Sequence, residues 1–154
     1  MNVMDFADYR LRMRSGTPAE TRSFYLAGLT HGVRHGATAV DRDLRTRLAG
    51  AIRDEHPNAV VHDPVESWYG DGGADREPAD YHRLAGLAAG SEVCVAWLPD
   101  RDAIADSVAE MQVARRAGGT VVAITDDADD FLVRTFASVV LPDVAAFSTW
   151  LRAA

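Results

Sequence analysis

The sequence predicts an α/β protein built on a single doubly wound, parallel five-stranded sheet with helices on both faces. Two observations support this prediction. Short apolar segments alternate five times with segments of helical character along the chain. The stretch 91–126 also reads as strand, loop, helix and strand, which is the βαβ unit of a parallel sheet.

Each expected element is delimited by a change in composition or by a breaker residue. In the first half, the elements are a strand at 23–28 (SFYLAG), a glycine-punctuated loop at 29–40, a helix at 41–56 ending before Pro57, a strand at 59–62 (AVVH), a polar loop at 63–78 and a helix at 79–89. In the second half, they are a strand at 91–98 before Pro99, a charged loop at 100–106, a helix at 107–119 closed by two glycines, a strand at 120–126, a helix at 130–136, a strand at 137–141 before Pro142 and a helix at 144–152. This order is that of a flavodoxin-like (Rossmann-like) domain spanning 23–154, preceded by an N-terminal extension at 1–22 with a short amphipathic helix at 4–14.

Length, composition and charge narrow the range of functions that the chain could have. A length of 154 residues suits one domain with its own core. The net charge of −7 argues against binding to nucleic-acid polymers or anionic membranes, because no basic surplus is available to neutralise phosphates. One cysteine permits no internal disulfide, and no apolar run reaches signal-peptide length or the roughly 20 residues of a membrane span. We therefore expect a cytoplasmic protein without membrane attachment.

The loops that follow the first two strands offer ligand-binding groups. In parallel sheets, ligands bind outside the carboxyl ends of the strands, where such loops converge. The first loop supplies glycines for close backbone approach and cations for an anion, or else it is simply a mobile basic loop; these residues are Gly32, His31 and Arg34, with Gly28 at the end of the strand before it. The second supplies Asp63 and two aromatic rings, Trp68 and Tyr69, which either stack on a planar heterocycle or fold the loop onto the domain.

Glu110 is the first candidate for a catalytic residue. If its helix starts at Ser107, the segment Ser107-Val108-Ala109-Glu110 matches a capping box, in which the glutamate returns to the cap amide. The same position, at the first helical turn and at the carboxyl edge of the sheet, is where a substrate would lie. A carboxylate there can attack an anomeric carbon or stabilise an oxocarbenium-like centre. Both interpretations remain open.

No metal ion or other cofactor is expected. The five histidines are scattered along the chain. His31 and His35 are four residues apart, but the predicted loop around them is rich in glycine and gives no secure helix on which to pair them.

The order of these motifs resembles the nucleoside 2-deoxyribosyltransferase family. The resemblance covers about 23–151 and rests on FYLAG with its polar loop, the strand SEVCVAWLP and the pattern S-x-x-E-M-x-x-A-x-x-x-G. It implies that Glu110 is the catalytic carboxylate and that Ser107 contacts sugar or phosphate. VVHDPVESWYG and GLTHGVRHG are similar to loops of the family's cytidine-monophosphate and deoxyribonucleotide N-glycosidases. Asp106 stands where the family motif opens with glycine, Gln112 replaces its second glycine, and Leu29 replaces the usual proline.

The resemblance implies hydrolysis of the N-glycosidic bond of a nucleoside 5′-monophosphate or nucleoside. Two alternatives stay open, a transferase that passes the sugar to a second base, and a non-catalytic nucleotide-binding module, which Asp106 favours. The expected site residues are, for catalysis, Glu110, Asp63 and Asp80, and, for substrate binding, Gly28, His31, Gly32, Arg34, Trp68, Tyr69 and Ser107. The resemblance also implies a homodimer or larger homo-oligomer.

Overall fold

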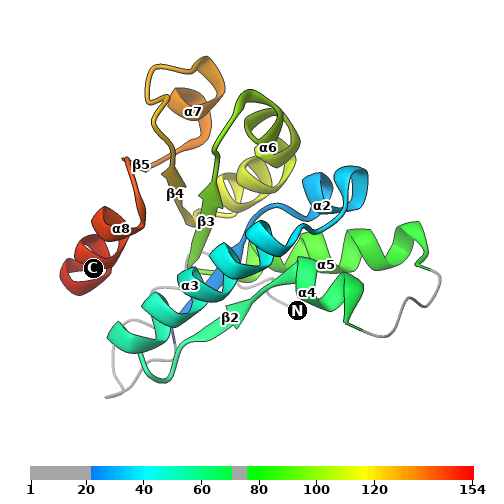
Figure 1. Cartoon of the computed structure of the whole chain (residues 1–154), viewed down its shortest axis with the longest axis horizontal. Helices are drawn as coiled ribbons and strands as arrows, with labels where there is room; N and C mark the ends of the chain where they lie inside the picture. The colour runs from blue at the N-terminus through cyan, green and yellow to red at the C-terminus, as the bar shows by residue number, and fades with distance from the viewer. Residues whose placement is uncertain (1–21, 71–75) are drawn as a thin grey trace, which may run out of the picture.

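A five-stranded, all-parallel sheet in the order β2-β1-β3-β4-β5 forms the centre of the computed structural model, which describes residues 22–70 and 76–154 (Figure 1). The strands are β1 (Ser23–Leu26), β2 (Val60–His62), β3 (Val93–Trp97), β4 (Thr120–Ile124) and β5 (Val139–Leu141). The helices are α2 (Leu29–His35), α3 (Ala39–Glu55), α4 (Pro64–Tyr69), α5 (Pro78–Gly90), α6 (Arg101–Arg116), α7 (Phe131–Phe136) and α8 (Val144–Ala153). The prediction of a doubly wound, flavodoxin-like α/β fold is confirmed.

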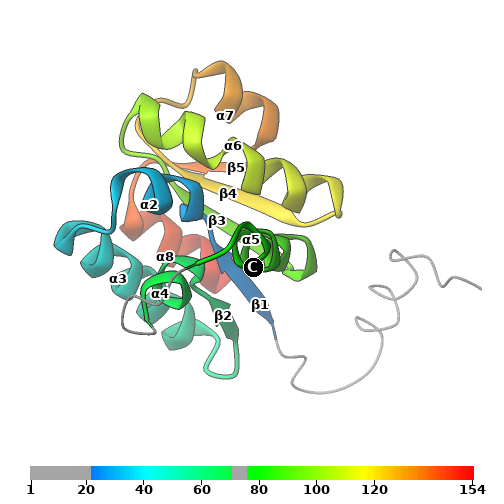
Figure 2. The same ribbon diagram turned by 90° about the vertical axis from the view of Figure 1, so that its right-hand side faces the viewer.

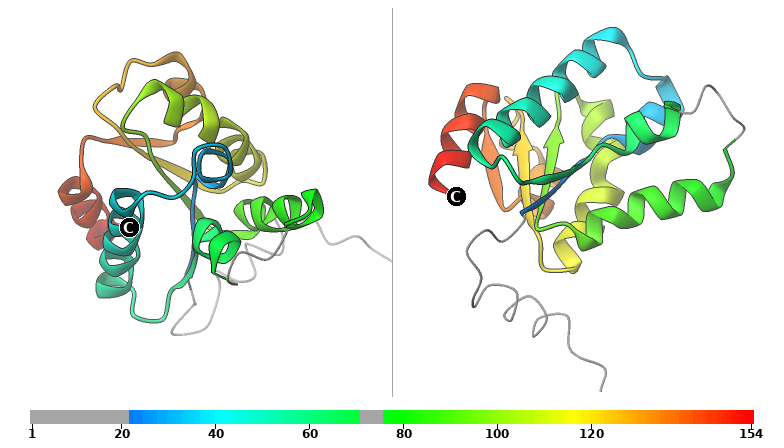
Figure 3. Two further views of the ribbon diagram at one scale, coloured as in Figure 1. Left: turned by 45° about the vertical axis from the view of Figure 1, so that its right-hand side comes forward. Right: turned by 90° about the horizontal axis from the view of Figure 1, so that it is seen from below.

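Both faces of the sheet are buried, because alternate residues of each central strand point to opposite sides. In β1, Phe24 belongs to the core under α3 and α8, whereas Tyr25 belongs to the core under α5, α6 and α7. Val95 and Cys94 of β3 divide in the same way, and both are almost fully buried. Figure 3 shows α3 beside α8 on one face and α5 and α6 on the other.

The segment 29–40 is mostly helical, so its prediction as a loop was wrong. Helix α2 occupies Leu29–His35 and lies against α6 (Figure 2). Two glycines, Gly32 and Gly36, disfavour a helix locally, and tertiary contacts of α2 with α6, described below, hold it in place. The polar loop 63–78 is likewise interrupted by α4, which begins where Asp63 accepts a hydrogen bond from the amide of Glu66.

The start of α6 also differs from the prediction. The helix begins at Arg101, because Asp100 caps it by accepting the amide of Ala103 at 2.8 Å. Ser107 is therefore an interior residue, and the capping box predicted from Ser107 and Glu110 was wrong. Glu110 lies in the third turn of the helix instead of the first.

The expected helix at 4–14 lies outside the described residues. Among the helices in the described part of the chain, none is long and apolar enough to cross a membrane.

Candidate functional site

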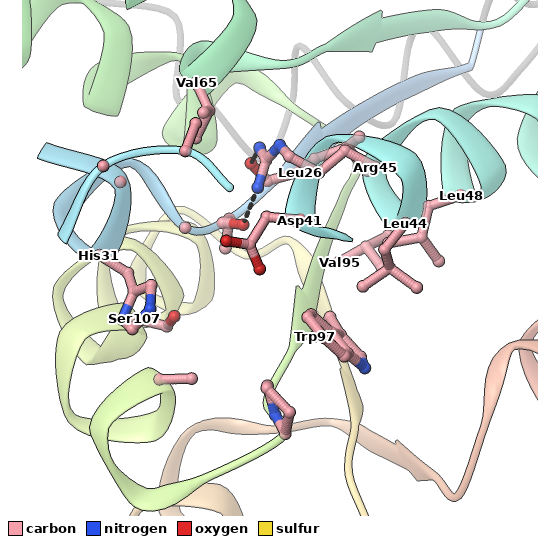
Figure 4. Close-up of a pocket in the computed structure, with 17 residues that line it drawn as sticks. Leu26, His31, Asp41, Leu44, Arg45, Leu48, Val65, Val95, Trp97 and Ser107 are labelled. Carbon is pink, nitrogen blue, oxygen red and sulfur yellow. Dashed lines mark hydrogen bonds between the residues drawn. The ribbon is translucent and has the colours of Figure 1, made fainter. Parts of the chain in front are cut away.

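A pocket lies at the carboxyl edge of the sheet, between the ends of β1 and β3. This is the point of the strand order at which the chain leaves β1 toward one side and β3 toward the other, where ligands of such sheets bind. The cavity itself has a volume of about 50 Å³ and continues into space that is open to solvent. Its lining includes Gly28, His31, Asp41, Arg45 and Trp97, and Figure 4 shows Asp41, Arg45 and Trp97 around the same space.

Arg45 of α3 is a pocket residue that the sequence did not single out. Its Nε donates to Asp63 Oδ1 at 2.8 Å, and its two terminal nitrogens donate to the carbonyl oxygens of Ala27 (2.9 Å) and Leu26 (2.7 Å). The guanidinium therefore binds the end of β1 and is neutralised by a carboxylate. Gly28 passes close to it, and a Cβ at Gly28 would lie 2.8 Å from Arg45 Nη1. The φ of +127° at Gly28 adds a second reason for glycine there.

Glu110 lies behind this corner of the pocket, and its carboxyl group is enclosed. The residue is 1% exposed and is not among the described residues that line the pocket. Its Oε2 accepts the Tyr25 hydroxyl at 2.5 Å, and its Oε1 accepts the amide of Thr30 at 3.3 Å. The amide of Gly28 lies 3.2 Å from both carboxyl oxygens. Glu110 thus caps α2 from another helix, since Gly28, the N-cap of α2, has no side chain to do so.

Burial is the main influence on the pKa values of Glu110 and Tyr25. Removal from water raises the pKa of Glu110 above its ordinary value, and the hydrogen bonds from Tyr25, Gly28 and Thr30 offset only part of that rise. Burial and the neighbouring Glu110 likewise raise the pKa of Tyr25, so its hydroxyl remains a donor. The groups that donate hydrogen bonds to Glu110 are therefore all uncharged. Arg45 acts on Glu110 only through its charge, which lowers the pKa of the carboxyl group.

Asp106 lies one turn earlier on α6 and has the opposite kind of surroundings. Its Oδ2 is 2.9 Å from His31 Nδ1 and 3.2 Å from His35 Nε2, and its Oδ1 accepts a short bond from Arg34 Nη1. Burial by itself raises the pKa of a carboxyl, but the hydrogen bond from His31 and the charge of Arg34 outweigh it. The pKa of Asp106 is therefore lowered.

The remaining residues predicted from the sequence are divided between the pocket and structural contacts. Gly28, Gly32, His31 and Ser107 line the pocket. Arg34 faces Asp106, with its side chain 62% exposed. Ser107 is almost fully buried.

Asp63, Asp80, Trp68 and Tyr69 are not among the described residues that line the pocket. Asp63 binds Arg45, and Asp80 forms the capping box of α5 with Glu77. Tyr69 donates its hydroxyl to the carbonyl oxygen of Gly32 at 2.6 Å, so it holds α4 against α2. Trp97, at the carboxyl end of β3, lines the pocket instead, and its place at the end of a strand was the signal for it.

The fold and the pocket together define an α/β protein with a doubly wound parallel sheet and a pocket at its switch point. No protein-family model matches the chain, and no curated protein matches it. Among solved structures, the chain is similar to a conserved protein from Enterococcus faecalis V583, with a TM-score of 0.63 and 17% sequence identity over 86% of this chain and 98% of that one. At this identity the likeness shows the fold alone.

Proposed function

We propose that the pocket between β1 and β3 binds a nucleoside-class ligand, a planar base carrying a sugar. The observation that carries the proposal is that Trp97, at the end of β3, and Gly28, just after the end of β1, both line the pocket at the switch point. The indole offers a stacking surface for a base, and Gly28 contributes main chain to the lining of the same pocket. The nucleoside class itself comes from the resemblance to the nucleoside 2-deoxyribosyltransferase family.

Charge favours an uncharged nucleoside over a 5′-monophosphate. The basic side chains of the pocket lining are already engaged, Arg45 with Asp63 and His31 with Asp106. Asp41 adds a negative charge to the same lining. The backbone amides at the start of α2, which would suit a phosphate, donate to Glu110 instead. To bind at any of these groups, a phosphate would therefore have to displace the carboxylate that already occupies it.

Calorimetric titration of the purified chain with nucleosides and with their 5′-monophosphates tests this proposal. We expect a nucleoside to bind, and the Trp97→Leu variant to bind it about 5- to 150-fold more weakly, since loss of stacking costs about 1–3 kcal/mol. Trp150→Leu is the matched control, because Trp150 stacks on Phe147 of α8, away from the pocket. Equal affinity in wild type and Trp97→Leu, or no nucleoside binding at all, would overturn the proposal. Much tighter binding of the monophosphates would overturn its preference for an uncharged ligand.

Cleavage of the N-glycosidic bond is the second candidate. It is favoured by Glu110, a buried carboxyl paired with Tyr25 directly behind Gly28. In that reaction the carboxylate attacks the anomeric carbon, the bond to the base breaks, and the base leaves with the electron pair and takes up a proton. Water then hydrolyses the glycosyl ester, or a second base accepts the sugar in the transferase. The amides of Gly28 and Thr30 must first release Glu110, because both its oxygens are occupied.

Chromatographic detection of free nucleobase separates the two candidates. If the chain is a glycosidase, wild type releases base and Glu110→Gln does so at least 100-fold more slowly, since the amide is a poor nucleophile. Glu66→Gln, an exposed glutamate of α4, should retain full activity. Adding an acceptor base and detecting a new nucleoside would assign the transferase. If wild type binds nucleosides and releases no base, the non-catalytic alternative holds.

A further inference from the structure

His31, His35 and Asp106 converge from two helices. His31 and His35 are four residues apart on α2, so their rings lie on one face of the helix with centroids 4.5 Å apart. Asp106 comes from α6, which packs against α2. The sequence analysis disfavoured a metal site because it placed the two histidines in a loop. Both lie on a helix in the structure, so that objection no longer applies.

We propose that these three residues form a binding site for one divalent transition-metal ion, for which zinc is the best fit. Two imidazole nitrogens and one carboxylate oxygen are a ligand set that zinc takes in sites with an open fourth position. One ligand atom from each residue can be chosen so that all three lie within 4.8 Å of one another. This proposal does not depend on the nucleoside site.

Two of the three distances between the ligand atoms are close to those of a tetrahedral site. His31 Nδ1 and His35 Nε2 lie 2.9 and 3.2 Å from Asp106 Oδ2. Ligand atoms bound to zinc at about 2.0–2.1 Å are about 3.3 Å apart in a tetrahedron. The two nitrogens lie within 4.8 Å of each other, so shifts of about 1.5 Å or less would bring all three atoms to this spacing.

Arg34 supports the ion-binding arrangement from outside. It holds Asp106 Oδ1, which leaves Oδ2 as the oxygen that faces both histidines. Carboxylates that ligate metals are commonly held in this way by an outer hydrogen bond. The side chain of Asp106 is 3% exposed, whereas those of His31 and His35 are 28% and 43% exposed, so an ion can enter from the histidine side.

The alternative is a network of hydrogen bonds in which the ring N–H groups donate to Asp106 and no metal takes part. The two differ in one respect that can be measured. A hydrogen-bonded network gains nothing from zinc, whereas a metal site joins α2 to α6 through the ion and stabilises the folded chain by mass action.

Zinc titration against a competing chelator, with any purification tag removed, tests the proposal. We expect one zinc ion per chain and a rise in the thermal unfolding midpoint when zinc is added. His35→Ala and Asp106→Asn should each bind zinc at least tenfold more weakly, and His35 is exposed enough for its variant to fold. His82→Ala, which removes an exposed histidine of α5 outside the cluster, should bind as wild type does.

A second readout identifies the ligands. Cobalt substitution gives absorption bands in the visible range whose intensity reports four-coordinate geometry, and these should be lost in His35→Ala and kept in His82→Ala. Circular dichroism confirms that each variant is folded. Wild type that binds no zinc stoichiometrically, or His35→Ala and Asp106→Asn that bind it as tightly as wild type, would overturn the proposal.

Discussion

Helix α6 carries two buried carboxyl groups one turn apart, and they hold opposite ends of α2. Glu110 binds the amino-terminal end of α2 through amides and a phenol, all of them uncharged. Asp106 binds side chains from the rest of α2, which are an arginine and two histidines. Exposure is similar, at 1% for Glu110 and 5% for Asp106, yet the pKa of Glu110 is raised and that of Asp106 is lowered.

The comparison teaches that burial alone does not decide the charge of a carboxyl group. Around Glu110, neutral donors do not compensate the carboxylate for the loss of water, so the protonated form is favoured relative to the charged form. Around Asp106, the hydrogen bond from an imidazole and the charge of a guanidinium outweigh the loss of water. The hydrogen bonds of Glu110 and those of Asp106 should therefore respond differently to mutation and to pH.

The largest expected effect is on stability when each carboxyl group is removed. Glu110→Ala should lower the free energy of unfolding by about 3 kcal/mol, because it leaves the Tyr25 hydroxyl and two amides without an acceptor inside the protein. Asp106→Ala should cost only about 1 kcal/mol, since Arg34 and His35 can turn to water. Urea unfolding in a chelator-containing buffer measures both, and equal losses would contradict the comparison.

The pH dependence of stability should have opposite signs for the two groups. The folded pKa of Glu110 lies above its unfolded value of about 4.3, so its contribution is most favourable below that pH and declines as pH rises toward the folded pKa. The folded pKa of Asp106 lies below its unfolded value of about 3.9, so its contribution is complete above that pH and is lost as pH falls through the folded pKa.

Urea unfolding of wild type, Glu110→Gln and Asp106→Asn over a pH series, without free metal, measures these contributions as differences from wild type. The stability advantage of wild type over Glu110→Gln should shrink as pH rises, and its advantage over Asp106→Asn should grow. Slopes of the same sign would show that the two environments do not differ as described.

The smallest effect is expected from the arginine itself. Arg34→Gln removes the full positive charge beside Asp106, but the Arg34 side chain is 62% exposed, so the free energy of unfolding should change by less than about 1 kcal/mol. The acid transition assigned to Asp106 should move to higher pH, because one of the influences that lower its pKa is gone. A larger loss of stability would mean that Arg34 matters to packing as well as to charge.

The strands of the sheet could be predicted from the sequence, whereas helix α2 could not. The strands were predictable because both faces of the sheet are buried, which gives short continuous apolar runs such as VCVAW in β3. Helix α2 was missed because its own residues, with two glycines in or after it, do not favour a helix. Its stability comes from Glu110 and Asp106, which are more than 70 residues away along the chain.

The candidate site shows the same limit. Gly28, Gly32, His31 and Ser107 were predicted from the loops that follow strands, and they line the pocket. Trp68 was expected beside a ligand because its segment was assigned to an open loop, but that segment forms α4. Arg45 gave no signal, since a single arginine in an amphipathic helix usually faces solvent, whereas here its guanidinium donates to the carbonyl oxygens of Leu26 and Ala27 at the end of β1.

The single thiol of the chain, Cys94, lies in the middle of β3 and is fully buried. Burial raises the pKa of this thiol, so the reactive thiolate is doubly suppressed in the native chain, by access and by ionisation. Cys94 belongs to the core under α5, α6 and α7, so an alkylating reagent can reach the sulfur only when this part of the core opens. The labelling rate of this one native atom therefore measures how often the core opens, without any introduced probe.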